Sequence, residues 1–248
     1  TYGESADRPS IDFYGRQVEL VQALAKTGKP VVAVIVNGKP LNNEWITEHI
    51  PALVDVWEPG MYGGQALAEI LFGQVNPSGK LPITIPKHAG QVPMYYYQAA
   101  SRYWTGYGLG STRADDLPAF CFGHGLSYTS FEYSDLHMDT VHHSTGDIEV
   151  SFKIKNTGSV SGKETPLLFV RDCVSSVVTP QNLLKEFTKV ELAPDEEQII
   201  RFQIPVSSLG LWNKDMNYVV EPGEFIFSIG RSLSDIRLKQ KIRIQETN

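Results

Sequence analysis

The sequence has 248 residues, of which 42% are hydrophobic and 20% are charged, a length that allows two domains of ordinary size. Its net charge is -6 at pH 7, acidic and basic residues are mixed, and no basic run occurs, which argues against nucleic acid or an anionic membrane as a partner. No apolar run is long enough to span a bilayer, so no membrane partner is expected.

The first half of the sequence has the periodicity of an α/β domain. A helix is predicted over 14–27, where apolar residues recur at helical spacing, and Gly28 is expected to end it. The continuous β-branched run at 31–36 predicts a strand buried on both faces, as in a parallel sheet, and the run at 52–57 repeats the pattern. With a further helix at 64–72, the rhythm of helix, strand, helix, strand, helix predicts an α/β layered domain.

The loops that leave the carboxyl ends of these strands begin at Asn37 and Glu58. Ligands of open α/β sheets gather at such loops, so this edge is where a site is expected. After the third helix, which Gly73 is expected to end, the Asn-Pro-Ser-Gly sequence at 76–79 predicts a turn. The segment at 81–85 is then predicted to be extended and at an edge, because prolines interrupt and follow it.

Beyond residue 130 the pattern changes to short strands of alternating polarity. Turn sequences such as Ala-Pro-Asp and Glu-Pro-Gly separate these strands, and no helical pattern intervenes. This spacing predicts an antiparallel β-sandwich. The predicted strands cover 149–155, 166–170, 188–192, 199–204, 225–229 and 238–244.

Four stretches of the sequence resemble motifs of the family 3 glycoside hydrolases, chiefly β-glucosidases and β-xylosidases, in the family's order. The longest covers 57–86 and reads W-E-P-G-x-x-G-G-x-A-x-A-x-x-L-F-G-x-x-N-P-S-G-K-L-P-x-T-x-P. The others are 3–8, similar to G-E-x-x-D-R, 122–129, similar to F-G-x-G-L-S-Y-T, and 155–158, similar to the family's N-T-G turn. The resemblance covers essentially the whole sequence, but only the rear half of a typical member.

The resemblance implies a fold and an activity. It implies the rear part of the family's α/β sandwich domain at 1–125, followed by an all-β fibronectin type III-like (Ig-like) sandwich at 130–248. The implied function is that of the C-terminal part of a retaining, exo-acting β-glycosidase that removes terminal non-reducing β-linked glucose by double displacement. β-Xylosidase specificity and a non-catalytic carbohydrate-binding or scaffolding module are the alternatives. The expected ligands are β-linked oligosaccharides and aryl or alkyl glycosides, and no cofactor or metal is expected.

The catalytic role rests on Glu4. Retaining glycosidases use two carboxyl groups about 5–5.5 Å apart, one a nucleophile and one a general acid/base. The family's G-E-x-x-D-R loop carries the acid/base, so the resemblance assigns this role to Glu4. Asp7 and Glu44 are the fallback candidates, although Asp7 is rather expected to pair with Arg8 and hold the shape of the loop.

The nucleophile has no counterpart in this sequence. The family places it, as an aspartate in a Ser-Asp-Trp-like segment, in an N-terminal (β/α)8 barrel, which is therefore an expected partner of this chain. Ser134-Asp135-Leu136 imitates that segment weakly, and we interpret it as a solvated strand position that opens the β-sandwich. Since one carboxylate cannot carry out a double displacement, we expect the chain to be inactive without its barrel.

The segment at 90–125 lacks periodicity and is rich in aromatic residues. It is interpreted either as a rim on which sugar rings stack or as packing between domains. Because loops of this domain lean over the active-site pocket in the family, the resemblance makes Arg102, Tyr103 and Trp104 the candidates for substrate contact.

Three histidines, His137, His142 and His143, have no carboxylate or cysteine at a ligand spacing, so we interpret them as solvated rather than as metal ligands. No signal peptide is visible at Thr1, but the family suggests a secreted or periplasmic protein. A homodimer is compatible with the sequence.

Overall fold

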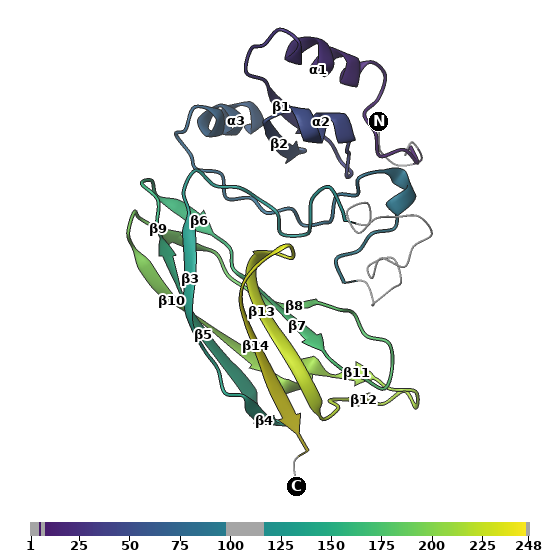
Figure 1. The fold of residues 1–248 in the computed structure, drawn as a ribbon, viewed down its shortest axis with the longest axis vertical. Coiled ribbons are helices and arrows are strands. Elements are labelled where there is room, and N and C mark those ends of the chain that lie inside the picture. The colour runs from purple at the N-terminus through teal and green to yellow at the C-terminus, as the bar shows by residue number, and fades with distance from the viewer. Residues whose placement is uncertain (1–4, 6–7, 98–116, 247–248) are drawn as a thin grey trace. The chain divides into compact units, whose positions relative to one another are not determined.

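The computed structural model describes residue 5, residues 8–97 and residues 117–246, which form two compact units (Figure 1). The first unit contains the described residues up to 75, Pro82–Tyr95 and the residues from 117 to 122. The second contains Asn76–Leu81, residues 96 and 97, and the residues from 123 onward. The short segment Asn76–Leu81 therefore belongs to the second unit, although the chain on both sides of it, up to residue 75 and from Pro82 to Tyr95, belongs to the first.

A parallel pair of strands is the centre of the first unit. β1 (Val32–Val36) pairs with β2 (Ala52–Trp57), and the described helices of this unit are α1 (Gln17–Ala25), α2 (Glu44–His49), α3 (Gly63–Leu71) and the short 3-10 helix η1 (Ala89–Gln91). Figure 1 shows α1, α2 and α3 arranged around the strand pair. In the described part of the chain, no helix has both the length and the apolar character to cross a membrane. The predicted rhythm of helices and strands is confirmed.

Local sequence explains where these helices begin and end. Asn43 caps α2, since its side-chain oxygen accepts a hydrogen bond from the backbone N–H of Ile46 at 3.3 Å. Gly28 and Gly73 follow α1 and α3 with φ values of 71° and 75°, in the left-handed region that glycine adopts without a Cβ clash. The helix ends predicted at these two glycines are confirmed.

The expectation that the strand at 31–36 is buried on both faces is wrong at its ends. Val32 is 47% exposed and Val36 is 64% exposed. Within the described residues the parallel sheet consists of β1 and β2 alone, so each strand has a single neighbour. Helix α1 also exposes apolar side chains, with Leu20 at 61% and Leu24 at 46%. The first unit therefore presents apolar surface that its own described residues leave uncovered.

The second unit is a β-sandwich. Its elements are β3 (Phe131–His137), β4 (Val141–His143), β5 (Asp147–Asn156), β6 (Gly162–Glu164), β7 (Leu167–Asp172), β8 (Leu183–Phe187), β9 (Val190–Leu192), β10 (Glu197–Pro205), η2 (Val206–Leu209), β11 (Leu211–Trp212), β12 (Tyr218–Val219), β13 (Gly223–Ser232) and β14 (Asp235–Gln245). One sheet has the order β10-β5-β3 and the other the order β4-β14-β13-β7-β8, while β6-β9 and β11-β12 form two-stranded ladders.

The sandwich is antiparallel as predicted except at one edge, where β4 runs parallel to β14. The chain crosses from β3 in one sheet to the edge of the other, and it arrives there running in the direction of β14. The predicted antiparallel β-sandwich is confirmed, and this three-residue strand is the exception to it among the described strands.

Alternation along the strands builds the core of the sandwich. In β5 every second residue, from Ile148 to Ile154, is buried, which is the pattern of a strand with one face on the core. Phe152 of this strand and Phe225 and Phe227 of β13 are each 1% exposed or less and belong to one apolar cluster. The aromatic side chains of the two sheets thus fill the space between them.

Candidate functional site

Most of the predicted site residues lie outside the described residues. These are Glu4, Asp7, Arg102, Tyr103 and Trp104. Their roles in acid/base chemistry and substrate contact remain predictions. The structure does describe the residues that follow the G-E-x-x-D-R loop and the edge of the sheet where a site was expected.

Arg8 anchors the described end of this loop. Its Nη2 donates a hydrogen bond to the carbonyl oxygen of Asp12 at 3.1 Å, and its guanidinium lies over the ring of Tyr14, 5.3 Å from the ring centroid. The backbone carbonyl of Arg8 accepts a hydrogen bond from the ammonium group of Lys39. Lys39 belongs to the loop after β1, so the residue that closes the G-E-x-x-D-R motif is tied to the carboxyl end of the parallel pair.

Two polar side chains lie at this end of the strands. Asn37, which is 1% exposed, follows β1, and its amide donates to Oδ2 of Asp55 in β2 at 3.5 Å. The other oxygen of Asp55 accepts from the backbone N–H of Trp57 at 3.2 Å. Burial raises the pKa of Asp55, against the lowering effect of these two hydrogen bonds. The Asp55 carboxyl group therefore shapes the ends of the strands and already uses both of its oxygens.

Asp55 is absent from the candidates that the sequence suggested. A charged residue within the apolar run Ala52–Trp57 was the available indication, because a carboxylate in a half-buried strand needs partners. By contrast, Glu44 is exposed in the first turn of α2, where its charge interacts favourably with the helix dipole. That position gives the fallback candidate a structural role.

The long motif and the F-G-x-G-L-S-Y-T motif contact each other within the second unit. Oδ1 of Asn76 accepts from the hydroxyl of Ser127 at 3.0 Å and from the backbone N–H of Tyr128 at 2.8 Å. Gly125 lies so close to the backbone that a Cβ there would be 2.2 Å from the carbonyl oxygen of Gly79. These residue types are required by close packing of two chain segments, so the motifs are structural at these positions.

An ion cluster of Lys80, Glu164 and Arg231 lies beside this contact. Glu164 is 1% exposed, and its two carboxylate oxygens accept from Nζ of Lys80 and from Nε of Arg231, each at 2.9 Å. The backbone N–H of Thr165 donates to the same carboxylate at 2.8 Å. Burial lowers the pKa of Lys80, and the charge of Glu164 opposes that shift. A perturbed pKa such as that of Lys80 can mark a reactive site. Here, however, the carboxylate of Glu164 is buried and both of its oxygens accept hydrogen bonds, so it has no room to bind a substrate.

The other sequence candidates in the sandwich are solvated. Asp135, in the segment that imitates the nucleophile, is 56% exposed and forms an ion pair with Lys153 at 3.2 Å. His137 and His143 are exposed, and Nε2 of His142 lies 2.8 Å from the carbonyl oxygen of Asp139. Among the described residues, no group of three or more His, Cys, Asp or Glu side chains could hold a metal ion. These positions fit the interpretation of solvated strand and loop residues.

Comparison with known proteins extends the resemblance to both units. Residues 1–128 match the glycosyl hydrolase family 3 C-terminal domain, and residues 164–233 match the fibronectin type III-like domain. The fold is accordingly an α/β domain followed by a fibronectin type III-like β-sandwich.

Several relatives are named as β-xylosidases or β-glucosidases. A β-xylosidase of Formosa agariphila is 42% identical over 234 residues, which cover 94% of this chain and 32% of that protein. A β-glucosidase of Bacteroides ovatus is 39% identical, with 94% of this chain and 33% of that protein covered. The structure of a β-glucosidase from Listeria innocua in complex with glucose superposes with a TM-score of 0.90 at 30% identity, over 98% of this chain and 34% of that one. The chain spans about a third of the length of these relatives. It belongs to glycosyl hydrolase family 3 and corresponds to the C-terminal part of the family's proteins.

Proposed function

We propose that this chain is the acid/base-bearing part of a retaining, exo-acting β-glycosidase, with terminal β-linked glucose as the preferred substrate. The observation that carries this proposal is the alignment of nearly the whole chain with proteins named β-xylosidase and β-glucosidase. The motif that includes Glu4 lies within the matched residues 1–128. In support, the described end of that motif, Arg8, is held at the carboxyl edge of the parallel strands, where ligands of α/β sheets bind.

The proposed reaction divides the work between two carboxyl groups. A carboxylate outside this chain attacks the anomeric carbon, while the Glu4 carboxyl group protonates the departing glycosidic oxygen. The sugar is then held as an ester of the nucleophile. The Glu4 carboxylate next takes a proton from water, whose oxygen attacks the anomeric carbon and releases the sugar with its configuration retained.

We further propose that the (β/α)8 barrel of the same enzyme supplies the nucleophile and is the partner of this chain. The apolar side chains that α1 and β1 expose, Leu20, Leu24, Val32 and Val36, support a larger assembly. Large apolar side chains that stay exposed in one domain can be covered by another domain of the same protein. A secreted or periplasmic location is part of the proposal, because one relative is named as the periplasmic β-glucosidase of Salmonella typhimurium.

Labelling of the nucleophile tests this division of roles. The reagent is a glucoside with fluorine next to the anomeric carbon and a dinitrophenyl leaving group. Fluorine slows both steps, and the leaving group departs without a proton, so the ester intermediate accumulates. In the enzyme that contains this chain, we expect one fluoroglucosyl group on a peptide outside these 248 residues. A label on a carboxylate of this chain, for example Asp55 or Asp135, would refute the proposed location of the nucleophile.

A further inference from the structure

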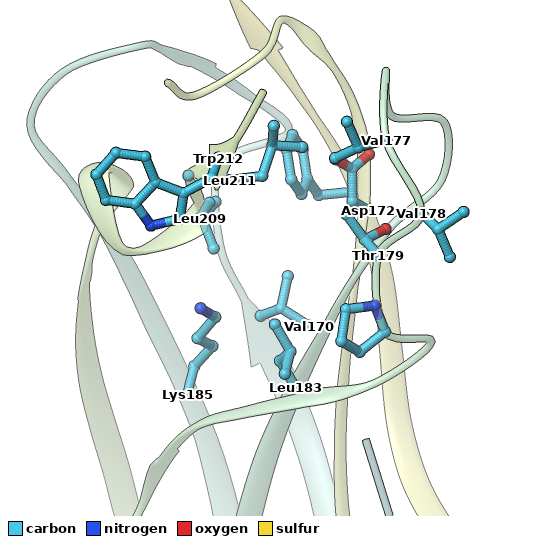
Figure 2. Close-up of a pocket in the computed structure, with 13 residues that line it drawn as sticks. Val170, Asp172, Val177, Val178, Thr179, Leu183, Lys185, Leu209, Leu211 and Trp212 are labelled. Carbon is cyan, nitrogen blue, oxygen red and sulfur yellow. The ribbon is translucent and has the colours of Figure 1, made fainter. Parts of the chain in front are cut away.

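The β-sandwich contains a pocket of about 260 Å³ between β11 and the loop that follows β7 (Figure 2). On one side lie Leu209, Leu211 and Trp212, and on the other Val177, Val178 and Thr179. Val170 of β7 and Leu183 of β8 lie between the two sides. All of these residues belong to the second unit, so the pocket is complete within the sandwich.

Trp212 forms an accessible aromatic wall of this pocket. It is 60% exposed, although burying an indole ring would normally stabilise the fold. The ring of Tyr218 packs against it edge to face, with the centroids 5.4 Å apart, and this contact limits the orientations open to the indole. A large aromatic ring that is held in place at the mouth of a hollow offers a flat surface to a ligand.

Two charged side chains bring hydrogen-bonding capacity into the same pocket. Asp172 is half-buried, and within the described residues its carboxylate accepts one hydrogen bond, from the backbone N–H of Val174 at 3.2 Å. No basic side chain of the described residues forms an ion pair with Asp172. Lys185 donates to the carbonyl oxygen of Ser208, which leaves further N–H groups of its ammonium available. The pocket therefore combines an aromatic face with spare acceptors and spare donors.

We propose that this pocket of the β-sandwich binds a sugar ring of a β-linked oligosaccharide, with the ring stacked on Trp212 and its hydroxyl groups bonded to Asp172 and Lys185. A pyranose has an apolar C–H face and an edge of hydroxyls that both donate and accept, which matches these groups. A purely apolar ligand would cover the two charged groups without replacing their hydrogen bonds to water, and that desolvation is unfavourable. Neutral polar ligands with one flat face avoid this cost.

The site would hold a saccharide independently of hydrolysis. It uses only residues of the sandwich, and it does not need Glu4 or a nucleophile. Binding at this pocket would keep an oligosaccharide substrate near the enzyme between cleavage events, which raises its effective concentration. The class of ligand is consistent with relatives, because a variant β-glucosidase of Listeria innocua was solved in complex with laminaribiose.

Titration of the 248-residue chain with laminaribiose and with xylobiose tests the proposal. In amide and indole NMR spectra, we expect the indole N–H signal of Trp212 to shift with sugar concentration. Trp212→Ala should weaken binding about tenfold, the order expected for loss of one aromatic contact. Phe187→Ala is the matched control, because Phe187 is an aromatic residue of the same sandwich that is 58% exposed and does not line the pocket. The affinity of this variant for both sugars should be unchanged.

Asp172→Asn and Lys185→Met probe the polar contacts if the tryptophan variant does not fold, and each should weaken binding several-fold. Saturable binding that all three pocket variants leave unchanged would overturn the proposal, as would a Trp212 signal unmoved by either sugar. Broadening of that signal with protein concentration in the absence of sugar would show that a second copy covers the pocket, and would overturn it as well. Because no hydrolysis is measured, failure here leaves the proposed glycosidase role intact.

Discussion

Single buried side chains explain why the motifs of this sequence have the residues they have. The clearest case is Asn156, the asparagine of the N-T-G turn, which is fully buried. Its Oδ1 accepts from the hydroxyl of Thr129 at 2.6 Å and from the backbone N–H of Gly158 at 3.1 Å. Its Nδ2 donates to the carbonyl oxygens of Val160 at 2.9 Å and Leu192 at 3.0 Å. The side-chain amide of Asn156 has two N–H donors and two acceptor sites, and each of them forms a hydrogen bond.

Replacement of the Asn156 side chain should destabilise the fold. Asn156→Ala removes four hydrogen bonds and leaves their partners without a match in a buried site, so we expect the free energy of unfolding to fall by about 3 kcal/mol. Urea unfolding followed by circular dichroism measures this change. Thr157→Ala is the matched control in the same turn, because Thr157 is exposed and its hydroxyl makes one long hydrogen bond of 3.3 Å to Ser130. Equal destabilisation by the two variants would contradict this role for Asn156.

At the scale of elements, the ion cluster of Lys80, Glu164 and Arg231 joins three parts of the second unit. Lys80 lies in the segment Asn76–Leu81, Glu164 ends β6, and Arg231 lies in β13. The two cations are 13% and 16% exposed and depend on the buried carboxylate for charge compensation. Removal of one partner from such a group leaves uncompensated charge in a poorly solvated place.

Glu164→Gln keeps the shape of the side chain and removes its charge. We expect a loss of about 3 kcal/mol of stability, since two partly buried cations then repel each other without an anion between them. The control is Glu191→Gln on β9, the strand paired with β6. Glu191 is 66% exposed and forms an ion pair with Lys163 at 3.5 Å, so we expect the free energy of unfolding to change by less than about 0.5 kcal/mol. Thermal unfolding of both variants at low and high salt measures the difference, and a near-neutral Glu164→Gln would rule out the stabilising role of the cluster.

Periodicity in the sequence predicted the long elements, because it reports burial of one face. The strand at 52–57 matches β2, the helix at 64–72 matches α3 to within one residue, and the six predicted strands of the sandwich are all present. The predicted ranges omit β3 and β8, which have seven and five residues, and also β4, β6, β11 and β12, which have two or three residues each. A segment of that length has no measurable period, and only its partner strand defines it.

The contacts around the motifs and the pocket of the sandwich were less predictable, because they are long-range. No feature of the sequence indicated that Asn76 contacts Ser127, which lies 51 residues further on, or that Lys80 pairs with Glu164. Nor did it suggest the pocket, because Asp172, Lys185 and Trp212 come from three separate strands. Resemblance to a family identified Glu4, but periodicity and composition alone do not distinguish it from a solvated carboxylate.

For the whole molecule, we propose that the chain carries only part of the catalytic machinery of a larger enzyme. It spans about a third of the length of its relatives, and its α/β unit exposes apolar side chains on α1 and β1. The proposed enzyme therefore draws one carboxyl group from this chain and one from its barrel. The acid/base role of Glu4 is the claim on which this division depends.

Glu4→Gln in the enzyme that contains this chain tests that claim most directly, by comparing an unactivated β-linked glucose disaccharide with dinitrophenyl glucoside. The disaccharide needs a proton on its leaving oxygen, so its kcat/KM should fall about 10²–10⁴-fold, whereas glycosylation by the dinitrophenyl substrate should change little. Asp7→Asn and Glu44→Gln serve as controls and should leave kcat/KM for the disaccharide nearly unchanged. Full activity of Glu4→Gln on the disaccharide, or a loss that appears instead in Asp7→Asn, would contradict the assignment of Glu4 as the general acid/base.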